Sequence, residues 1–126
     1  MSKEIINTNN APAPIGPYNQ AVKAGNFLFL SGQVALIPST GELANKDIIE
    51  EAHQVMKNLK AVLAEAGLNF NQVVKTTIFL SSMDLFTEVN EVYGSYFEGN
   101  YPARETVAAK TLPKNANVEI SMIAIG

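Results

Sequence analysis

Hydrophobic residues follow two different periods along this chain, and the changes of period divide it into helices and strands. Two stretches carry apolar residues at helical spacing and are expected to be helices: 48–66 and 85–97. Five runs rich in β-branched or aromatic residues are expected to be strands: 18–22, 27–30, 73–80, and the runs that open at Arg104 and Asn117. This order of elements predicts an α+β fold, a mixed sheet with both helices packed on one face.

Local signals mark the ends of the two expected helices. Asp47, followed three residues later by Glu50, has the spacing of an N-cap and its partner, and Gly67 is a typical stop signal. Asp84 is the expected N-cap of the second helix, and Gly99 is its expected end. Residues 7–17 are rich in Asn, Pro and Gly, so they are expected to lack regular structure.

Several expected strands are apolar on both faces, and residues 27–30 show this most clearly. Two helices can cover only one face of a sheet. The other face would leave a large apolar surface in water unless another protein surface covers it. The pattern therefore predicts an oligomer.

Composition narrows the class of protein. With 126 residues, 47% of them hydrophobic, the chain is expected to form one domain over residues 1–126. The chain has no apolar run long enough for a membrane span, and its first residues do not resemble a signal peptide, so a cytoplasmic protein is expected. Zero cysteines and a single histidine make a metal site improbable. A net charge of −3 disfavours nucleic acid as a partner.

Two charged residues stand in otherwise apolar strands, Arg104 and Glu119. Such charges are costly unless they are paired or lie in a cleft. One interpretation is a structural ion pair between them. The other is that Arg104 stays free and turns its planar fork of donors toward an anion such as a carboxylate. Ser31-Gly32, at the end of an apolar run, is either a simple bulge or a pair of backbone donors for a small ligand.

Four separated motifs occur in the order that they have in a known family. They are residues 11–21 (APAPIGPYNQA), 30–33 (LSGQ), 86–90 (FTEVN), and Tyr101-Pro102-Ala103-Arg104 with the Leu-Pro-Lys and Val-Glu-Ile segments that follow it. In these motifs the chain resembles the RidA/YjgF family of reactive intermediate deaminases, and the resemblance covers nearly its whole length.

The resemblance implies a fold, an assembly and a reaction. The family has a chorismate-mutase-like fold and forms homotrimers with sites in clefts between subunits. Its members hydrolyse 2-imino acids, notably 2-aminoacrylate and 2-iminobutyrate, to 2-keto acids and ammonia without metal or cofactor. The imines come from pyridoxal-phosphate-dependent dehydratases that act on serine and threonine.

The resemblance also implies roles for individual residues. Arg104 would clamp the substrate carboxylate, Glu119 would position and deprotonate the attacking water, and Tyr18 would hydrogen-bond near the substrate. The remaining expected substrate-binding residues are Ser31, Gly32, Asn90 and Thr106.

Glu105-Thr106 departs from the Ser-Cys or Ser-Thr that many members carry after the arginine. Strand alternation should turn Glu105 to the face opposite Arg104. Two other functions stay open. A regulatory module could bind a 2-keto acid at Arg104 without turnover. Ribonuclease activity is less favoured, because the chain is acidic and has no pair of histidines.

Overall fold

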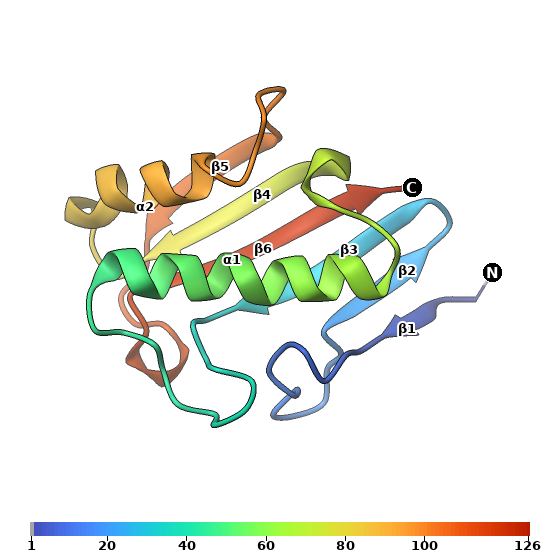
Figure 1. Cartoon of the computed structure of the whole chain (residues 1–126), viewed down its shortest axis with the longest axis horizontal. Coiled ribbons are helices and arrows are strands. Elements are labelled where there is room, and N and C mark those ends of the chain that lie inside the picture. Colours follow the sequence, from blue (N-terminus) through green and yellow to red (C-terminus); the bar gives the residue numbers. More distant parts are fainter. Residues whose placement is uncertain (1) are drawn as a thin grey trace.

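The computed structural model describes residues 2–126 and shows a six-stranded mixed sheet with both helices on one face (Figure 1). The strand order is β1-β2-β3-β6-β4-β5; β4 and β5 are parallel and every other pair is antiparallel. The elements are β1 (Glu4–Ile6), β2 (Ala21–Ala24), β3 (Phe27–Gln33), α1 (Ile48–Glu65), β4 (Val73–Leu80), α2 (Phe86–Gly94), β5 (Ala103–Ala108) and β6 (Val118–Ile125). The expected α+β class is confirmed.

The N-terminal part of the sheet differs from the expectation in two ways. The edge strand β1 was not expected, and β2 begins at Ala21, so Tyr18 lies in the preceding loop. The buried side chain of Gln20 explains this boundary. Its amide accepts from the Thr8 N–H at 2.7 Å and donates to the Thr8 and Pro12 carbonyls at 3.0 and 2.8 Å. Gln20 thus ties the loop down just before the strand begins.

The helix α1 follows its sequence signals closely. Asp47 is its N-cap and accepts a hydrogen bond from the Glu50 N–H at 2.8 Å. The helix ends at Glu65, and Gly67 takes a left-handed conformation (φ +75°) just beyond it. Its buried residues include Val55, Met56, Leu59 and Leu63, which lie in the main core.

The helix α2 is shorter than expected and begins differently. The N-cap of this region is Ser82, whose hydroxyl accepts from the Asp84 N–H at 3.1 Å, and a 3-10 turn over residues 83–85 precedes the helix. The helix ends at Gly94, not at Gly99, because Gly and Ser are weak helix formers and the Ser95 hydroxyl donates to the Val92 carbonyl at 2.6 Å. The expected Asp84 cap and Gly99 end were therefore wrong.

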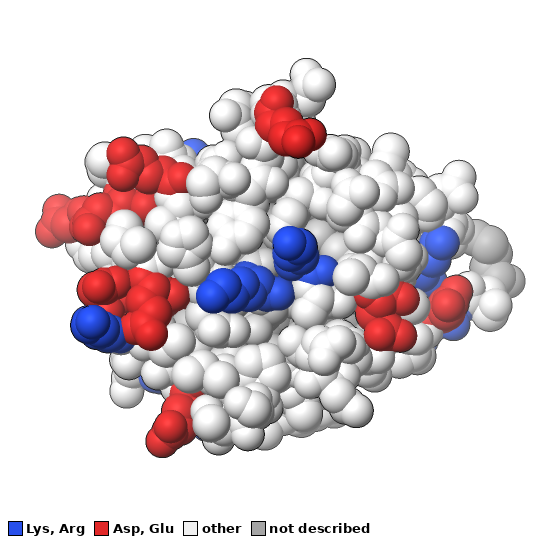
Figure 2. Space-filling model, in the orientation of Figure 1, with Lys and Arg blue, Asp and Glu red and all other residues white. Residues whose placement is uncertain are grey.

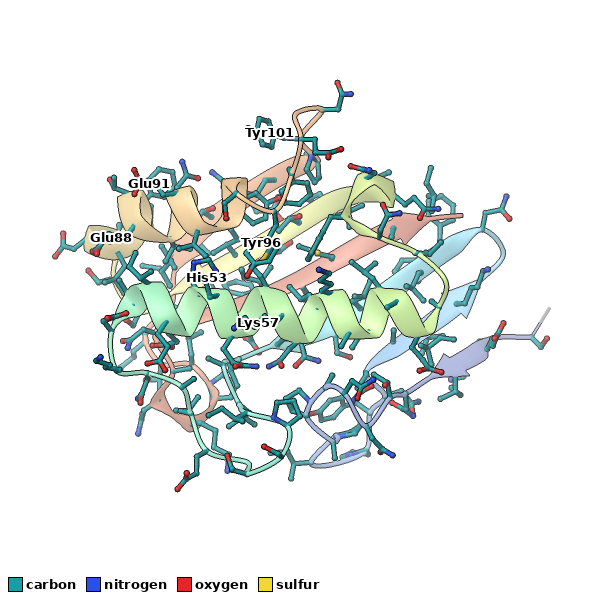
Figure 3. The ribbon with its side chains drawn as sticks, viewed as in Figure 1. His53, Lys57, Glu88, Glu91, Tyr96 and Tyr101 are labelled. Carbon is teal, nitrogen blue, oxygen red and sulfur yellow. The ribbon has the colours of Figure 1, made fainter. Side chains whose placement is uncertain are left out.

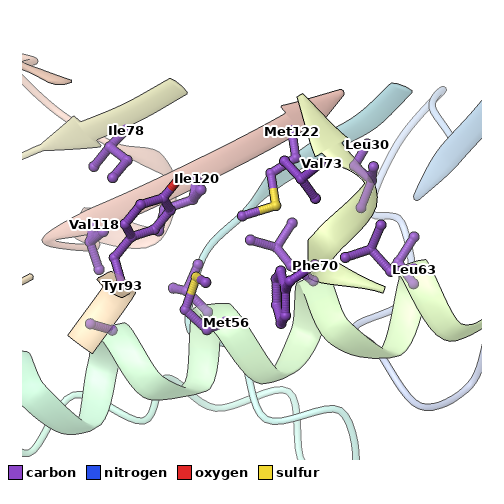
Figure 4. Packing of buried hydrophobic residues seen from close by; sticks show 14 of the residues in the cluster. Leu30, Met56, Leu63, Phe70, Val73, Ile78, Tyr93, Val118, Ile120 and Met122 are labelled. Carbon is purple, nitrogen blue, oxygen red and sulfur yellow. The ribbon is translucent and has the colours of Figure 1, made fainter. Parts of the chain in front are cut away.

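The main core lies between the helices and the sheet (Figure 4). Alternate residues of the central strands point into it, among them Leu30 of β3, Ile78 of β4 and Ile120 of β6. A smaller apolar cluster gathers Val34, Leu36, Leu112 and Ala116, with Phe79 packed against it. Phe79 alternates with Ile78 and Leu80, so this cluster reaches the opposite face of the sheet.

That opposite face, which no helix covers, carries exposed apolar side chains. Phe27, Phe29, Val107 and Ile125 are 50%, 46%, 47% and 41% exposed. Phe27 and Ile125 are cross-strand neighbours on β3 and β6, so the exposed residues are contiguous there. This face is called the open face below.

The helix-bearing face carries separate groups of basic and acidic side chains. Basic side chains lie over the middle of α1, and acidic side chains gather around α2 (Figure 2). On this face His53 and Tyr96 point toward each other (Figure 3), with the His53 Nδ1 2.9 Å from the Tyr96 hydroxyl. Within residues 2–126, no helix is both long and apolar enough to span a bilayer.

Candidate functional site

The expected site residues divide between two hollows of the chain. The first has a volume of about 540 Å³ and is lined by α2 and the start of β5: Asn90, Tyr93, Gly94, Tyr101, Pro102 and Arg104. The second has a volume of about 510 Å³ and lies at the open face, where Tyr18, Ser31, Gly32 and Glu119 meet. We call them the arginine hollow and the glutamate hollow.

Arg104 and Glu119 lie on opposite faces of the sheet. Arg104 is paired in register with Thr76 of β4, whose side chain is buried beneath α2. Glu119 is paired with Phe79, one strand position from the core-facing Ile78. Among residues 2–126 the ion pair between charged side chains is that of Lys75 with Glu105, so Arg104 has no carboxylate partner. The interpretation of Arg104 and Glu119 as an ion pair within one chain is therefore wrong.

Neutral groups surround the Arg104 guanidinium. Its Nη1 donates to the Asn90 Oδ1 at 2.6 Å. Its Cζ lies 5.7 Å from the ring centre of Phe86 and 5.2 Å from that of Tyr93, within the range of cation–π contacts. These contacts leave the positive charge uncompensated at the hollow.

Glu119 owes its position to a bulge in β3. The register between β3 and β6 shifts between Leu30 and Gln33, so Ser31 and Gly32 together oppose Ser121. The Glu119 carboxylate lies directly over Gly32: a Cβ at residue 32 would stand 2.8 Å from Oε2 and 3.0 Å from Cδ. Gly32 therefore allows the close approach of the Glu119 side chain, and its role as a backbone donor to a ligand stays a prediction.

Glu119 is also partly withdrawn from water. Burial raises the pKa of its carboxyl above the ordinary value. A carboxyl of this kind keeps a proton more readily and is a stronger base once it is ionised.

Ser31 and Tyr18 are partly engaged within the chain. The Ser31 N–H donates to the Gln20 carbonyl at 2.9 Å, and its hydroxyl donates to the Asn19 carbonyl at 2.6 Å. Ser31 is therefore an acceptor for a ligand, because both of its donors are used. Tyr18 is 48% exposed and its hydroxyl accepts from the Ile15 N–H at 3.3 Å, which leaves the hydroxyl proton free to donate.

Thr106 and Glu105 lie on β5 beside Arg104 but line neither hollow. The Thr106 hydroxyl is buried and has no hydrogen-bond partner among the described residues. The Glu105 carboxylate accepts from the Thr77 hydroxyl at 2.8 Å and pairs with Lys75 at 3.1 Å, on the face opposite Arg104. These two bonds lower the pKa of the Glu105 carboxyl, so it does not compete for the guanidinium.

Lys114 also lines the glutamate hollow, a position that was not expected from the sequence. Its backbone is left-handed (φ +60°), an unfavourable conformation for a residue with a Cβ. Nearby, the fully buried Glu51 carboxylate holds the start of β6 by accepting from the Asn117 and Val118 N–H groups at 2.7 and 3.3 Å. The only sequence signal for Lys114 is the Leu-Pro-Lys motif. In the sequence, Glu51 cannot be told from an ordinary solvated residue of a helix.

The two hollows carry different chemistry. The arginine hollow suits a carboxylate, because it offers an uncompensated guanidinium. The glutamate hollow offers a base and polar hydroxyl groups for handling water. No cluster of three His, Asp or Glu side chains that could hold a metal occurs in residues 2–126.

Together, the mixed sheet and the two helices on one face define an α+β protein of chorismate-mutase-like fold, and this protein carries two surface hollows. A family model described as "Endoribonuclease L-PSP" matches residues 8–126. The chain belongs to this family, which is the RidA/YjgF family, so the resemblance seen in the motifs is confirmed.

Relatives support the assignment over the full length. The chain is 50% identical to a RutC family protein of Pyrococcus horikoshii, covering 97% of each, and 47% identical to the mouse 2-iminobutanoate/2-iminopropanoate deaminase, covering 98% of this chain and 91% of that one. A structure of E. coli TdcF with bound serine superposes with a TM-score of 0.94 at 38% identity, covering 98% of each chain. Family members thus include hydrolytic imine deaminases, and one of them binds a small amino acid.

Proposed function

We propose that this protein hydrolyses small 2-imino acids, such as 2-aminoacrylate in its imine form and 2-iminobutyrate, to the 2-keto acid and ammonia. Water adds to the C=N carbon and forms a C–O bond. The C–N bond then breaks, so imino acid and water give keto acid and ammonia with no change of oxidation state. These imines form when dehydratases remove water from serine and threonine.

The observation that supports this proposal most is the uncompensated charge of Arg104. Its Nη1 bonds a neutral amide oxygen, and both neighbouring rings are uncharged. A planar 2-imino acid carboxylate matches the remaining donors of the fork. Once held there, the imine carbon has a fixed position for attack.

The proposal also requires two copies of the chain. Arg104 and Glu119 face opposite sides of one sheet, so one carboxylate-bound substrate cannot reach both within a chain. The exposed apolar residues of the open face give a second copy a surface to bind. We infer a homotrimer in which the arginine hollow of one subunit meets the glutamate hollow of the next.

In that cleft Glu119 acts on the water. Its ionised carboxylate takes a proton from the water as the C–O bond forms, and later returns it to the departing nitrogen. The raised pKa suits both steps. Tyr18 donates to the substrate or to the water, and Ser31 and Gly32 line the remaining surface.

The test is a coupled assay in which a serine or threonine dehydratase generates the imine and its disappearance is followed, with spontaneous hydrolysis subtracted. Arg104→Lys keeps the charge but loses the fork, and a charge-assisted hydrogen bond contributes roughly 1.5–3 kcal/mol. We expect kcat/KM to fall by roughly 10- to 100-fold. Lys60→Ala, which removes an exposed cation from α1, is the control and should not change it.

Arg104 is the sole arginine of the chain, so a second readout is available. An arginine-selective reagent such as phenylglyoxal should modify this residue, and 2-ketobutyrate should protect it. If 2-ketobutyrate protects Arg104 but the protein does not hydrolyse imine, the protein is a regulatory module that binds a 2-keto acid and not a deaminase. If Arg104→Lys keeps full activity, the proposed role of Arg104 as a carboxylate clamp is wrong.

A further inference from the structure

The helix α2 presents three residues to Arg104 from a single face. Phe86, Asn90 and Tyr93 are spaced by four and three positions, the spacing of neighbours on a helix surface. All three contact the guanidinium: Asn90 through a hydrogen bond of 2.6 Å, and the two rings at 5.7 and 5.2 Å from Cζ. A helix face thus approaches the one arginine of the chain.

Tyr93 is itself firmly anchored. It is 4% exposed, its hydroxyl donates to the Thr76 Oγ1 at 2.9 Å, and its ring centre lies 4.8 Å from that of Phe97. Thr76 is the register partner of Arg104 on the neighbouring strand. The strand pair and the Tyr93 hydrogen bond therefore place the Tyr93 ring at a fixed position relative to the backbone of Arg104.

This arrangement limits how the guanidinium can turn. A free arginine side chain has many rotamers, and holding it in one of them costs conformational entropy. The two rings favour positions of the guanidinium close to them, and the bond to Asn90 fixes one arm. The remaining donors then point in a set direction before any ligand arrives.

We infer that Phe86, Asn90 and Tyr93 are positioning residues that orient the Arg104 fork in the ligand-free protein. Asn90, expected from the sequence to bind substrate, acts through Arg104 instead. An amide suits this position because it accepts a hydrogen bond without neutralising the guanidinium. The identity of the anion rests on the proposed function, but the orientation of the fork does not.

The test uses the single arginine. Its Nε–H group gives one signal in a ¹H–¹⁵N correlation spectrum of arginine-labelled protein, and a held guanidinium gives a sharp, shifted signal. We expect Phe86→Leu and Asn90→Ala to broaden this signal or move it toward the position of free arginine, with no ligand present. Tyr93→Phe keeps the ring and should preserve most of the shift.

The same variants are titrated with 2-ketobutyrate. Phe86→Leu should lower its affinity by roughly 3- to 30-fold, the scale of a partly desolvated cation–π contact. Asn90→Asp should also lower it, because a carboxylate at this place neutralises the guanidinium. Tyr96→Leu is the control: it removes a ring near α2 that contacts His53 and Phe70, so it should lower stability without changing the Arg104 signal.

The outcomes separate the two proposals. If Phe86→Leu and Asn90→Ala leave the ligand-free signal unchanged, the positioning role is wrong. If the signal changes in Asn90→Ala only after 2-ketobutyrate is added, Asn90 is a substrate contact. If the parent protein neither binds 2-ketobutyrate nor hydrolyses imine, the proposed function fails, and the ligand-free spectra still decide the orientation of Arg104.

Discussion

Glu119 is the residue at which stability and function oppose each other. Burial raises the pKa of its carboxyl, so the folded protein favours the protonated form more than the unfolded chain does. The protonated Glu119 carboxyl therefore contributes its full stability below the pKa that it has in the unfolded chain. This contribution is lost as the pH rises through the pKa that it has in the folded protein. At neutral pH the ionised carboxylate destabilises the fold, although the proposed reaction needs it in this form.

Glu119→Gln should separate the two effects. At pH 7 we expect a higher Tm than that of the parent, because a neutral amide replaces a partly buried charge. The difference should shrink toward the ordinary carboxyl pKa of 4.5. Turnover should fall by roughly 100-fold or more, the usual scale of general acid–base catalysis. Melting curves at several pH values and the imine assay measure both.

The affinity of Glu119→Gln for 2-ketobutyrate is the control measurement. Because this variant keeps Arg104, we expect it to bind 2-ketobutyrate as the parent protein does. If Glu119→Gln turns over the imine as fast as the parent protein, Glu119 has no part in the mechanism. In the parent, activity should rise with pH through the raised pKa of Glu119. A flat profile there would argue against a base at this position.

At the scale of elements, the bulge of β3 connects chain geometry to the proposed catalysis. It lets the Glu119 carboxylate lie over Gly32, where a Cβ would come within 2.8 Å of Oε2. A Cβ added at residue 32 would meet the Glu119 side chain, which can move, and would meet no backbone atom. A substitution there should therefore displace the carboxylate while leaving the fold in place.

We expect Gly32→Ala to lower turnover by roughly 10- to 100-fold, because displacing a catalytic group by about 1 Å can cost that much. Its Tm should change little. Gly25→Ala is the matched control: it has no neighbour within 4 Å, but its φ of +60° makes alanine strained there. That variant should lose stability and keep its turnover, and a loss of turnover equal to that of Gly32→Ala would contradict the role of close approach.

The elements also show what the sequence could and could not predict. The cap at Asp47, the helix α1 and the strand β4 follow from local pattern, and they were predicted correctly. The start of α2 was missed because Asp84 and Ser82 are both good caps, and the choice depends on the packing of the 3-10 turn. The strand β1 was missed because three residues carry too little pattern.

The sequence indicated candidate site residues but not their arrangement. The motifs pointed to Tyr18, Ser31, Gly32 and Glu119, and the fold does bring these four together. The faces of Arg104 and Glu119 depend on which strands pair and in which register. Such pairing is not local, so no window of sequence contains it. The contacts of α2 with Arg104 also depend on how the strands pair.

At the scale of the whole molecule, the open face is the surface on which the proposed trimer would form. Its exposed apolar residues, Phe27, Phe29, Val107 and Ile125, favour burial against another copy. Sedimentation equilibrium at micromolar concentration should then give three times the mass of the 13.6 kDa chain. A stable monomer would exclude both the trimer and a site shared between subunits.

Mixing two inactive variants tests the shared site directly. Arg104→Ala and Glu119→Gln should each be nearly inactive alone. After subunits exchange, some clefts should combine the intact Arg104 of one variant with the intact Glu119 of the other. Random mixing in equal amounts should restore roughly a quarter of the parental activity. If subunits exchange and activity stays at the level of either variant, Arg104 and Glu119 do not meet across subunits.

The position of β6 has a consequence for how the protein is made. This strand comes last among the described elements, yet it lies between β3 and β4 (Figure 1). Until residues 118–125 leave the ribosome, the nascent chain holds a three-stranded piece and a two-stranded piece whose edges have no partner. Folding must therefore wait for this strand, and a chain interrupted before it would present two open edges to chaperones and proteases.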